Sequence, residues 1–297
     1  MARIITDYSH THIMYRSLFI LFYLLLLLPS CSKENSGEPA VPGGTGVTVG
    51  NERVTVMSYN TRHCAPYYGV SGEETVPDVD GIANVIKSKM PDVVLLQEID
   101  SCTTRSLGVD QAKEIAARAK YPYYHFFRIM DYRSGEYGLA MLSKKPFKET
   151  KTYLFPDEIE GQVMTSDNAV GTAIINIGGT DISFAVTHLS TIQSERDLQI
   201  TYALENIFEP IKRPVVLGGD FNATPSNSTI AILDAAGFTR TNTDPTKFTI
   251  PSNNPNRELD YITYYPNDRF RVVSHTVITG VNASDHLPII SVLEIKP

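Results

Sequence analysis

The chain has 297 residues, of which 26 are lysine or arginine and 33 are aspartate or glutamate, so its formal charge at pH 7 is -7. This balance argues against a protein that grips long nucleic acid, because such binding depends on many basic contacts. The chain has no tryptophan, the best stacking surface for a base, although 16 tyrosines remain.

The first thirty residues have the pattern of an export signal. Leu18 to Leu28 is an unbroken apolar run, too short for a transmembrane helix but suited to the core of a signal peptide. It ends in Leu28-Pro29-Ser30-Cys31, which resembles the bacterial lipoprotein cleavage motif and makes Cys31 the lipidated first residue of the mature chain. Cleavage without lipidation is the alternative.

The start of that signal is better placed at Met14 than at Met1. Asp7 and two histidines are unusual at the head of a signal peptide, whereas a start at Met14 gives a compact lead that carries the positive charge of Arg16. Residues 31–50 contain almost no bulky apolar side chains and are typical of a flexible tether.

Residues 51–297 are long enough for one large α/β domain with a sizeable core. Removal of residues 1–30 takes away Arg3, Arg16 and Asp7, which leaves 24 basic and 32 acidic residues. The mature chain is therefore even more acidic than the precursor. A small or lipidic anionic substrate is still compatible with this charge, because one local cationic pocket is enough to hold it.

Hydrophobic periodicity predicts about four helices and many strands in this domain. Ser194 is the expected N-cap of the third helix, with Asp197 returning the hydrogen bond, and Gly178-Gly179 is the expected turn of a hairpin. The predicted helices cover residues 80–89, 109–120, 194–208 and 228–236. The predicted strands cover residues 54–60, 93–97, 123–130, 138–143, 169–177, 181–188, 215–220, 259–264, 270–278 and 288–295.

Polar side chains able to exchange protons or bind metals stand where several of these strands end. Strand ends at one rim are where an α/β sheet builds a site. Carboxylate, amide and imidazole groups together suit metal-assisted attack on a phosphate ester. The fragments are Ser58-Tyr59-Asn60, Leu96-Gln97-Glu98, Val186-Thr187-His188, Gly219-Asp220-Phe221-Asn222, Glu258-Leu259-Asp260-Tyr261 and Ser284-Asp285-His286.

In order and residue type, these fragments resemble the endonuclease/exonuclease/phosphatase superfamily, from about Val54 to Ile295. Gly-Gly-Asp-Phe-Asn followed by Leu-Asp-Tyr and Ser-Asp-His-Leu-Pro is the most specific part. The resemblance implies an α/β (α+β) fold: a deoxyribonuclease-I-like, four-layer α-β-β-α sandwich of two packed mixed sheets. It specifies the chemistry better than the substrate, because members of the superfamily share catalysis while their substrates diverge.

The expected cofactor is Mg2+, with Mn2+ or Ca2+ as alternatives. Glu98 is the best hard-oxygen ligand, since Mg2+ keeps most of its waters and needs only one or two carboxylates. Asn60 can orient a metal-bound water or the phosphate, and Asp285 can complete the metal shell.

His286 is the expected general base, because an imidazole accepts a proton near neutral pH. The resemblance assigns Asp260 as the carboxylate that fixes its tautomer and raises its basicity. Asp220 and Asn222 should share one side of an extended segment, one holding the attacking water and the other a non-bridging oxygen. Relatives differ in whether Asp220 or His286 acts as the base. His188 would bind the phosphoryl oxygen or assist the leaving group.

The candidate substrate-binding residues lie close to these positions in the sequence. Arg105 could clamp a phosphate with two hydrogen bonds, although a plain surface arginine is the competing interpretation. Arg62 and Arg257 are weaker candidates of the same kind, and Tyr137 is expected to line the pocket. Cys64 and Cys102 each lie four residues beyond a proposed site residue, so a disulfide between them and two separate thiols are both open.

The sequence thus predicts an exported, metal-dependent phosphoesterase acting on a small or lipid-derived phosphate ester. A nuclease acting on extracellular DNA or RNA is the second hypothesis, and a non-catalytic binding protein on the same scaffold is the third. The expected location is the bacterial cell envelope, on the periplasmic or surface face of the outer membrane, with lipidated Cys31 in the bilayer. The expected oligomeric state is a monomer.

Overall fold

The computed structural model of the protein describes residues 52–70 and 75–296. The expected signal peptide, lipidated Cys31 and tether lie outside these residues. Within the described part of the chain, no helix combines the length and the apolar character needed to span a bilayer.

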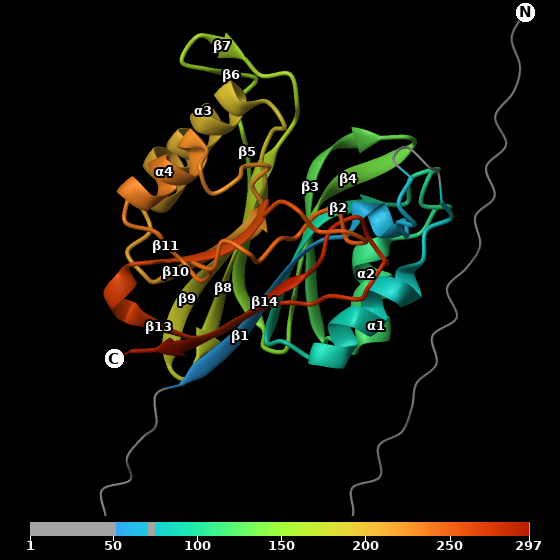
Figure 1. Cartoon of the computed structure of the whole chain (residues 1–297), viewed down its shortest axis with the longest axis horizontal. Coiled ribbons are helices and arrows are strands. Elements are labelled where there is room, and N and C mark those ends of the chain that lie inside the picture. The colour runs from blue at the N-terminus through green and yellow to red at the C-terminus, as the bar shows by residue number, and fades with distance from the viewer. Residues whose placement is uncertain (1–51, 71–74, 297) are drawn as a thin grey trace, which may run out of the picture. The chain divides into compact units, whose positions relative to one another are not determined.

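Two six-stranded sheets form the centre of the domain (Figure 1). The first has the order β13-β14-β1-β2-β4-β3. It is mixed, because β1 runs parallel to β2 while the other neighbours are antiparallel. Its strands are β1 (Arg53–Asn60), β2 (Val93–Ser101), β3 (Tyr123–Tyr132), β4 (Gly135–Ser143), β13 (Phe270–Val277) and β14 (Ile289–Ile295).

The second sheet has the order β11-β12-β10-β9-β8-β5 and is also mixed, with β9 parallel to β10. A separate short hairpin pairs β6 (Glu158–Ile159) with β7 (Gln162–Val163). The strands of the second sheet are β5 (Phe147–Leu154), β8 (Ala169–Ile177), β9 (Thr180–His188), β10 (Val215–Asp220), β11 (Thr239–Arg240) and β12 (Asp260–Tyr265).

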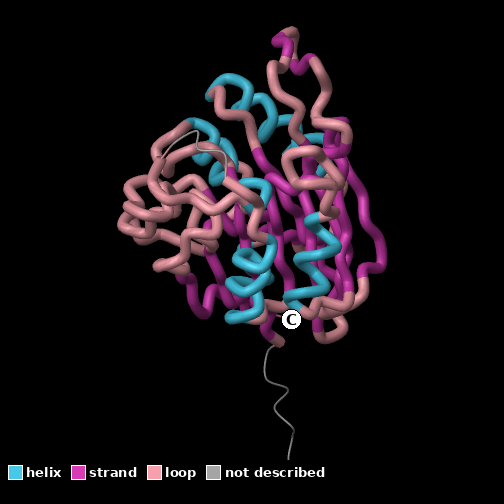
Figure 2. Tube along the Cα trace, turned by 90° about the vertical axis from the view of Figure 1, so that its right-hand side faces the viewer, coloured by secondary structure: helices cyan, strands magenta, loops and turns pink. Residues whose placement is uncertain are grey.

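The sheets face each other, and helices cover their outer faces (Figures 1 and 2). Residues from both sheets, among them Leu95, Phe184 and Leu293, form the buried central core. The helices α1 (Val79–Lys89) and α2 (Gln111–Ala119) pack on the first sheet through a second cluster. The helices α3 (Gln193–Ala203) and α4 (Ser228–Ala235) pack on the second sheet through a third. These layers confirm the expected four-layer sandwich.

The third helix differs from its expected form at both ends. Ile192 is the N-cap and supplies no side-chain bond, so the capping role predicted for Ser194 is wrong. Asp197 instead accepts hydrogen bonds from the Ser228 and Thr229 hydroxyls and ties α3 to α4. After α3 the chain continues as a π-helical turn, Leu204–Phe208. Two 3-10 turns, Arg62–Cys64 and Asn267–Arg269, complete the helical segments.

The parallel strand pairs place the polar strand ends at one rim. Asn60 lies opposite Gln97 at the ends of β1 and β2, and Asp220 lies opposite His188 at the ends of β10 and β9. A side chain at Gly219 would place its Cβ 1.9 Å from the Thr187 carbonyl oxygen, so this close approach of β9 and β10 requires glycine.

Candidate active site

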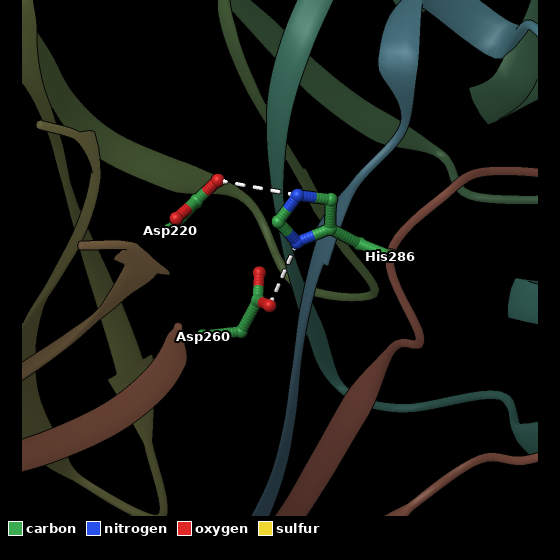
Figure 3. A group of neighbouring side chains, drawn as sticks. All are labelled: Asp220, Asp260 and His286. Carbon is green, nitrogen blue, oxygen red and sulfur yellow. Dashed lines mark hydrogen bonds and ion pairs between the residues drawn. The ribbon is translucent and has the colours of Figure 1, made fainter. Parts of the chain in front are cut away.

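His286 stands between two buried carboxylates (Figure 3). Its Nδ1 lies 2.8 Å from Asp260 Oδ2, and its Nε2 lies 3.5 Å from Asp220 Oδ2. Asp220 and Asp260 face each other across β10 and β12. His286 arrives from the loop before β14, which Ser284 fastens to the end of β1 by donating from its hydroxyl to the Asn60 carbonyl at 2.7 Å.

The two carboxylates set the proton affinity of this imidazole. Burial by itself lowers the pKa of His286, but the negative charges of Asp260 and then Asp220 outweigh it and raise the pKa to about 10. Burial raises the pKa of Asp260, and the neighbouring His286 opposes that rise. The two carboxylates therefore increase the affinity of the His286 imidazole for a proton.

Asn60 joins this group to Glu98. Its amide Nδ2 donates to Glu98 Oε1 at 2.9 Å and to Asp220 Oδ2 at 3.0 Å, and its Oδ1 accepts from the Arg62 backbone N–H. Glu98 has a left-handed backbone with φ of 55°, within a bulge of β2. Such strain in a non-glycine residue is concentrated at functional sites, and here it turns Glu98 toward Asn60.

His188 and Asn222 form the opposite side of Asp220. His188 Nε2 lies 3.5 Å from Asp220 Oδ2 and 3.0 Å from Asn222 Nδ2. Tyr137 OH lies 3.5 Å from His188 Nδ1. Asn222 has a φ of 50° and donates its backbone N–H to Asp220 Oδ1 at 2.8 Å. The expected convergence of Glu98, Asp220 and His286 is thus present, with Asn60 and Asp220 as the shared links.

Asp285 and Arg62 lie beside this group and face each other. Arg62 Nε is 3.9 Å from Asp285 Oδ2, and Arg62 Nη1 donates to the Pro66 carbonyl. The Asp285 carboxylate also accepts from the Ser284 hydroxyl at 3.3 Å. Its negative charge contributes to the raised pKa of His286. Asp285 is therefore close to the site but already has a cationic neighbour.

A cavity of about 440 Å³ adjoins one side of the site, where Glu98, Tyr137 and His188 line it. Hydroxyl and amide groups form much of the remaining wall, from Thr165, Ser166, Asn168, Ser190 and Thr191. The described residues that line a larger cavity of about 690 Å³ elsewhere in the domain include no histidine. The acid-base groups assign the active site to the smaller cavity.

Arg105 lines the cavity but is held by a partner of the same chain. It donates to both carboxylate oxygens of Asp100, at 2.7 and 2.8 Å. Its guanidinium carbon lies 4.6 Å from the ring centroid of Tyr132 and 5.8 Å from that of Tyr137. The fork expected to clamp a phosphate is therefore already used by a buried carboxylate, and Arg105 acts as part of the wall.

Some of the other sequence candidates lie away from this cavity. Arg257 is exposed and forms an isolated bridge with Ile250, and it does not line the cavity. Cys64 is buried and Cys102 is exposed, and both are free thiols, so the structure contains no disulfide between them.

The donor set suits a hard divalent cation near Glu98. Of the two carboxylate oxygens of Glu98, only Oε1 accepts a hydrogen bond from a described residue, Asn60. Oε2 is therefore available beside the cavity. Oxygen ligands of this kind fit Mg2+. Asp220, Asp260 and His286 are also close enough to share an ion. We favour Glu98, because Asp260 and His286 already satisfy each other at 2.8 Å.

Several residues that shape the site were not predicted from the sequence. Asp100 captures Arg105, and Asn168 donates its amide to the His188 carbonyl at 2.8 Å. Glu195 and Gln199 are fully buried polar residues on α3. Their spacing of four residues on one helical face was the available signal, since a polar pair on a buried face needs partners.

The model of the endonuclease/exonuclease/phosphatase family matches residues 57–286. No curated protein matches the chain significantly. Similar solved structures include a family member from Bacteroides thetaiotaomicron, with 17% identity, a TM-score of 0.68, and coverage of 83% of this chain and 99% of that one. A mannosyl-6-phosphatase from the same organism has 18% identity, a TM-score of 0.65 and coverage of 81% and 99%.

The human nocturnin catalytic domain with bound sulfate is also similar, with 19% identity, a TM-score of 0.62 and coverage of 82% of this chain and 94% of that one. At such low identity these likenesses establish the deoxyribonuclease-I-like fold. The family model adds the chemistry, because it spans the residues from β1 to His286 that meet at the rim. The chain belongs to the endonuclease/exonuclease/phosphatase family, and it is an enzyme that hydrolyses phosphoester bonds.

Proposed function

We propose that the protein is a Mg2+-dependent phosphoesterase that hydrolyses a small phosphate ester by attack of a base-activated water. The observation that carries this proposal is the chain of contacts from Glu98, which lines an open cavity of about 440 Å³, through Asn60 and Asp220 to His286. Carboxylate, amide and imidazole groups in such contact can bind the divalent cation that offsets the charge of a phosphate, and they can transfer a proton at the same place.

In this proposal His286 removes the proton from the attacking water. Asp260 receives the Nδ1 hydrogen bond, which fixes the ring orientation and leaves Nε2 on the side of Asp220. Asp220 orients the water through the same carboxylate oxygen that Asn60 holds. His188 and Asn222 lie next to Asp220 and are placed to contact a phosphoryl oxygen.

Glu98 would hold the metal ion, and Asn60 would keep the Glu98 carboxylate in position. Enzymes of this family are generally dependent on divalent metals, and Mn2+ or Ca2+ are alternatives to Mg2+. When bound, such an ion offsets negative charge on the phosphate and lowers the proton affinity of neighbouring groups. With such an ion held by Glu98, the imidazole of His286 would come closer to the range in which it can act as a base.

The cavity favours a substrate with one phosphate and a compact polar remainder. Among the described residues, Arg105 is the only arginine or lysine that lines the cavity, and Asp100 already neutralises it. A nucleic-acid strand brings several flanking phosphates, which need additional cations. A sugar phosphate or a lipid headgroup phosphate needs only one phosphate site and hydroxyl partners, which the cavity wall supplies.

We also propose that the enzyme acts at the bacterial envelope as a monomer anchored through lipidated Cys31. The apolar run that ends in Leu28-Pro29-Ser30-Cys31 supports this location.

A substrate panel tests the function. Purified protein in MgCl2 is assayed with a sugar phosphate, bis(p-nitrophenyl) phosphate, sphingomyelin, RNA and plasmid DNA, alongside His286→Ala and Glu98→Gln. We expect turnover of a small or lipid-derived ester that EDTA and both substitutions abolish. Rapid nicking of plasmid DNA at physiological salt would instead make the protein a nuclease, and inertness toward the whole panel would contradict the proposal.

A further inference from the structure

The segment after β9 forms one wall of the active-site cavity, and buried side chains hold its backbone. The strand ends at His188, and after the Leu189 N–H, which still donates to the Asp220 carbonyl at 3.0 Å, side chains take over from the ladder. Asn168 Nδ2 donates to the His188 carbonyl at 2.8 Å. The Ser190 backbone N–H donates to Gln199 Oε1 at 2.9 Å, and Gln199 Nε2 donates to Asn168 Oδ1 at 3.0 Å. Gln199 thus connects Asn168, and through it His188, to α3.

Glu195, one turn earlier on α3, holds a second part of the same wall. Its Oε1 accepts from the backbone N–H and the hydroxyl of Thr165, at 3.0 and 2.7 Å. Its Oε2 accepts from the hydroxyls of Ser190 and Ser166, at 2.7 and 3.3 Å. One buried carboxylate therefore joins the segment after β7 to the segment after β9, and both segments line the cavity.

Arg196 reinforces this arrangement from the same turn of the helix. It is also buried, and its Nη1 donates to the Thr191 carbonyl at 2.6 Å and to the Ser190 carbonyl at 3.3 Å. Burying a carboxylate, a guanidinium and an amide on one helix carries a desolvation cost that their hydrogen bonds must offset. An apolar helix face would avoid that cost, so packing alone does not account for these residues.

We propose that Glu195 and Gln199 are positioning residues that set the place of His188 and the shape of the cavity wall formed by the segments after β7 and β9. This inference rests on the proposed function for its catalytic consequence. Glu195 fixes the segment that carries Asn168, Asn168 fixes the His188 carbonyl, and His188 is thereby held against Asp220 and Asn222. The side chains of Thr165, Ser166 and Thr191 are presented to the non-phosphate part of the substrate by the same network.

The arrangement predicts that a change in Glu195 acts on turnover more than on substrate capture. The metal ligand Glu98 and the pair of His286 and Asp260 lie on other elements, so they keep their geometry. His188 alone is displaced, and its contact to the phosphoryl group matters most in the transition state. A misplacement of about 1 Å in such a group reduces turnover by up to about 100-fold.

The test compares Glu195→Gln and Asn168→Ala with Glu209→Gln, which makes the same chemical change at an exposed position beyond α3. Three quantities are measured: amide hydrogen exchange, the NMR signals of the His188 ring, and kcat and KM for the best substrate of the panel. In Glu195→Gln we expect exchange at Thr165 and Ser190 to rise about tenfold. In both Glu195→Gln and Asn168→Ala, the His188 signals should shift. In both variants kcat should fall by roughly tenfold or more, while KM stays within about threefold of the wild-type value.

Glu209→Gln should match the wild type in all three quantities. A fall in kcat without any change in the His188 signals would overturn the proposal. Faster amide exchange at Thr165 and Ser190 together with a wild-type kcat would also overturn it. The exchange and NMR measurements need no substrate. If the wild type hydrolyses nothing in the panel, the proposed function fails while these two measurements still decide whether Glu195 positions His188.

Discussion

The Nδ1 atom of His286 and the Oδ2 atom of Asp260 lie 2.8 Å apart, although the residues are 26 positions apart in the sequence. Asp260 is the first residue of β12, and His286 belongs to the loop that precedes β14. The contact joins the second sheet to a loop fastened to the first sheet. The base and its orienting carboxylate therefore depend on the packing of the two sheets.

Replacement of Asp260 by asparagine should lower both the pKa of His286 and the catalytic rate. The carboxylate is the largest influence that raises this pKa, while burial, which lowers it, stays in place. NMR titration of the metal-free protein should place the His286 pKa below about 10 in Asp260→Asn. General-base catalysis contributes about 10²- to 10⁴-fold, so kcat should fall within that range. Asp268→Asn, on an exposed turn, is the control.

An unchanged kcat in Asp260→Asn would show that Asp220, and not His286, removes the proton. The two assignments also differ in their pH profiles. If His286 is the base, the acidic limb of kcat should move with the pKa of the imidazole when Asp260 is changed.

Replacement of Glu98 by glutamine should weaken the stabilisation of the fold by Mg2+. A ligand that binds only the folded state stabilises it by about 2.7 kcal/mol at a hundredfold excess over its Kd. Thermal unfolding of the wild type with and without MgCl2 should show this gain, and EDTA should reverse it. Glu98→Gln keeps the oxygen that accepts from Asn60 but loses the charge, so its gain should be much smaller.

Glu136→Gln is the matched control, because Glu136 lies on β4 and pairs with Arg128 at the surface. Its response to MgCl2 should equal that of the wild type. Equal stabilisation of Glu98→Gln and wild type would mean that the ion binds elsewhere, with the cluster of Asp220, Asp260 and His286 as the next site to examine.

Glu258 should make the fold less stable as the pH rises. Burial raises the pKa of its carboxyl from 4.5 to about 7, while the hydrogen bond from Asn242 opposes the rise. Between these two values the folded state keeps a proton that the unfolded state has lost, so stability falls with increasing pH by a total of about 3 kcal/mol. Urea unfolding of Glu258→Gln should show higher stability than the wild type at pH 8 and a weaker pH dependence.

The substitution Glu258→Gln keeps the Oε1 acceptor for Asn242, so the comparison isolates the charge. At pH 4, below both pKa values, the Glu258 carboxyl is mainly protonated in the folded and in the unfolded state. The variant and the wild type should therefore unfold at nearly the same urea concentration there. A stability difference that persists unchanged from pH 4 to pH 8 would refute the assignment to Glu258.

Removal of the Arg105 guanidinium should destabilise the fold strongly. Arg105→Met leaves the fully buried Asp100 carboxylate without its cation, which costs about 3–5 kcal/mol. Arg240→Met breaks a pair with Asp234 at 2.9 Å nearer the surface and should cost about 0–1 kcal/mol. Urea unfolding measures both. A loss of substrate affinity in Arg105→Met without loss of stability would restore the phosphate-clamp role expected from the sequence.

Much of the fold and of the site was predictable because the sequence marks where each buried strand ends. Short β-rich apolar runs mark the buried strands, and the residue that ends each run lies at a rim. For that reason Asn60, Glu98, His188 and Asp220 could be proposed as neighbours, and the structure brings them together through direct contacts. The strand β5 was not predicted, because its alternation of exposed and half-buried residues contains little apolar contrast.

The roles of side chains that act through partners were not predictable in this way. Arg105 looked available from its position after Glu98, but Asp100 takes both sides of its guanidinium. Ser194 looked like a helix cap, but the helix begins one residue earlier, at Gln193, and Glu195 serves the cavity wall. The local sequence shows which polar groups are present. The hydrogen-bond partners of these groups lie on other segments, which only the fold brings next to them.

The class of chemistry can be read from the order of amino acids alone: the residue types at the strand ends, the family that they indicate and the acidic balance of the chain. The contacts between side chains come only from the folded chain. Examples are the capture of Arg105 by Asp100 and the hydrogen bonds that connect Glu195 and Gln199 on α3 to Ser190 and Asn168. This difference follows from the range of the interactions. Hydrophobic periodicity is a local property, but a hydrogen bond requires two groups to meet within about 3 Å, and only the packing of both sheets and their helices brings them that close.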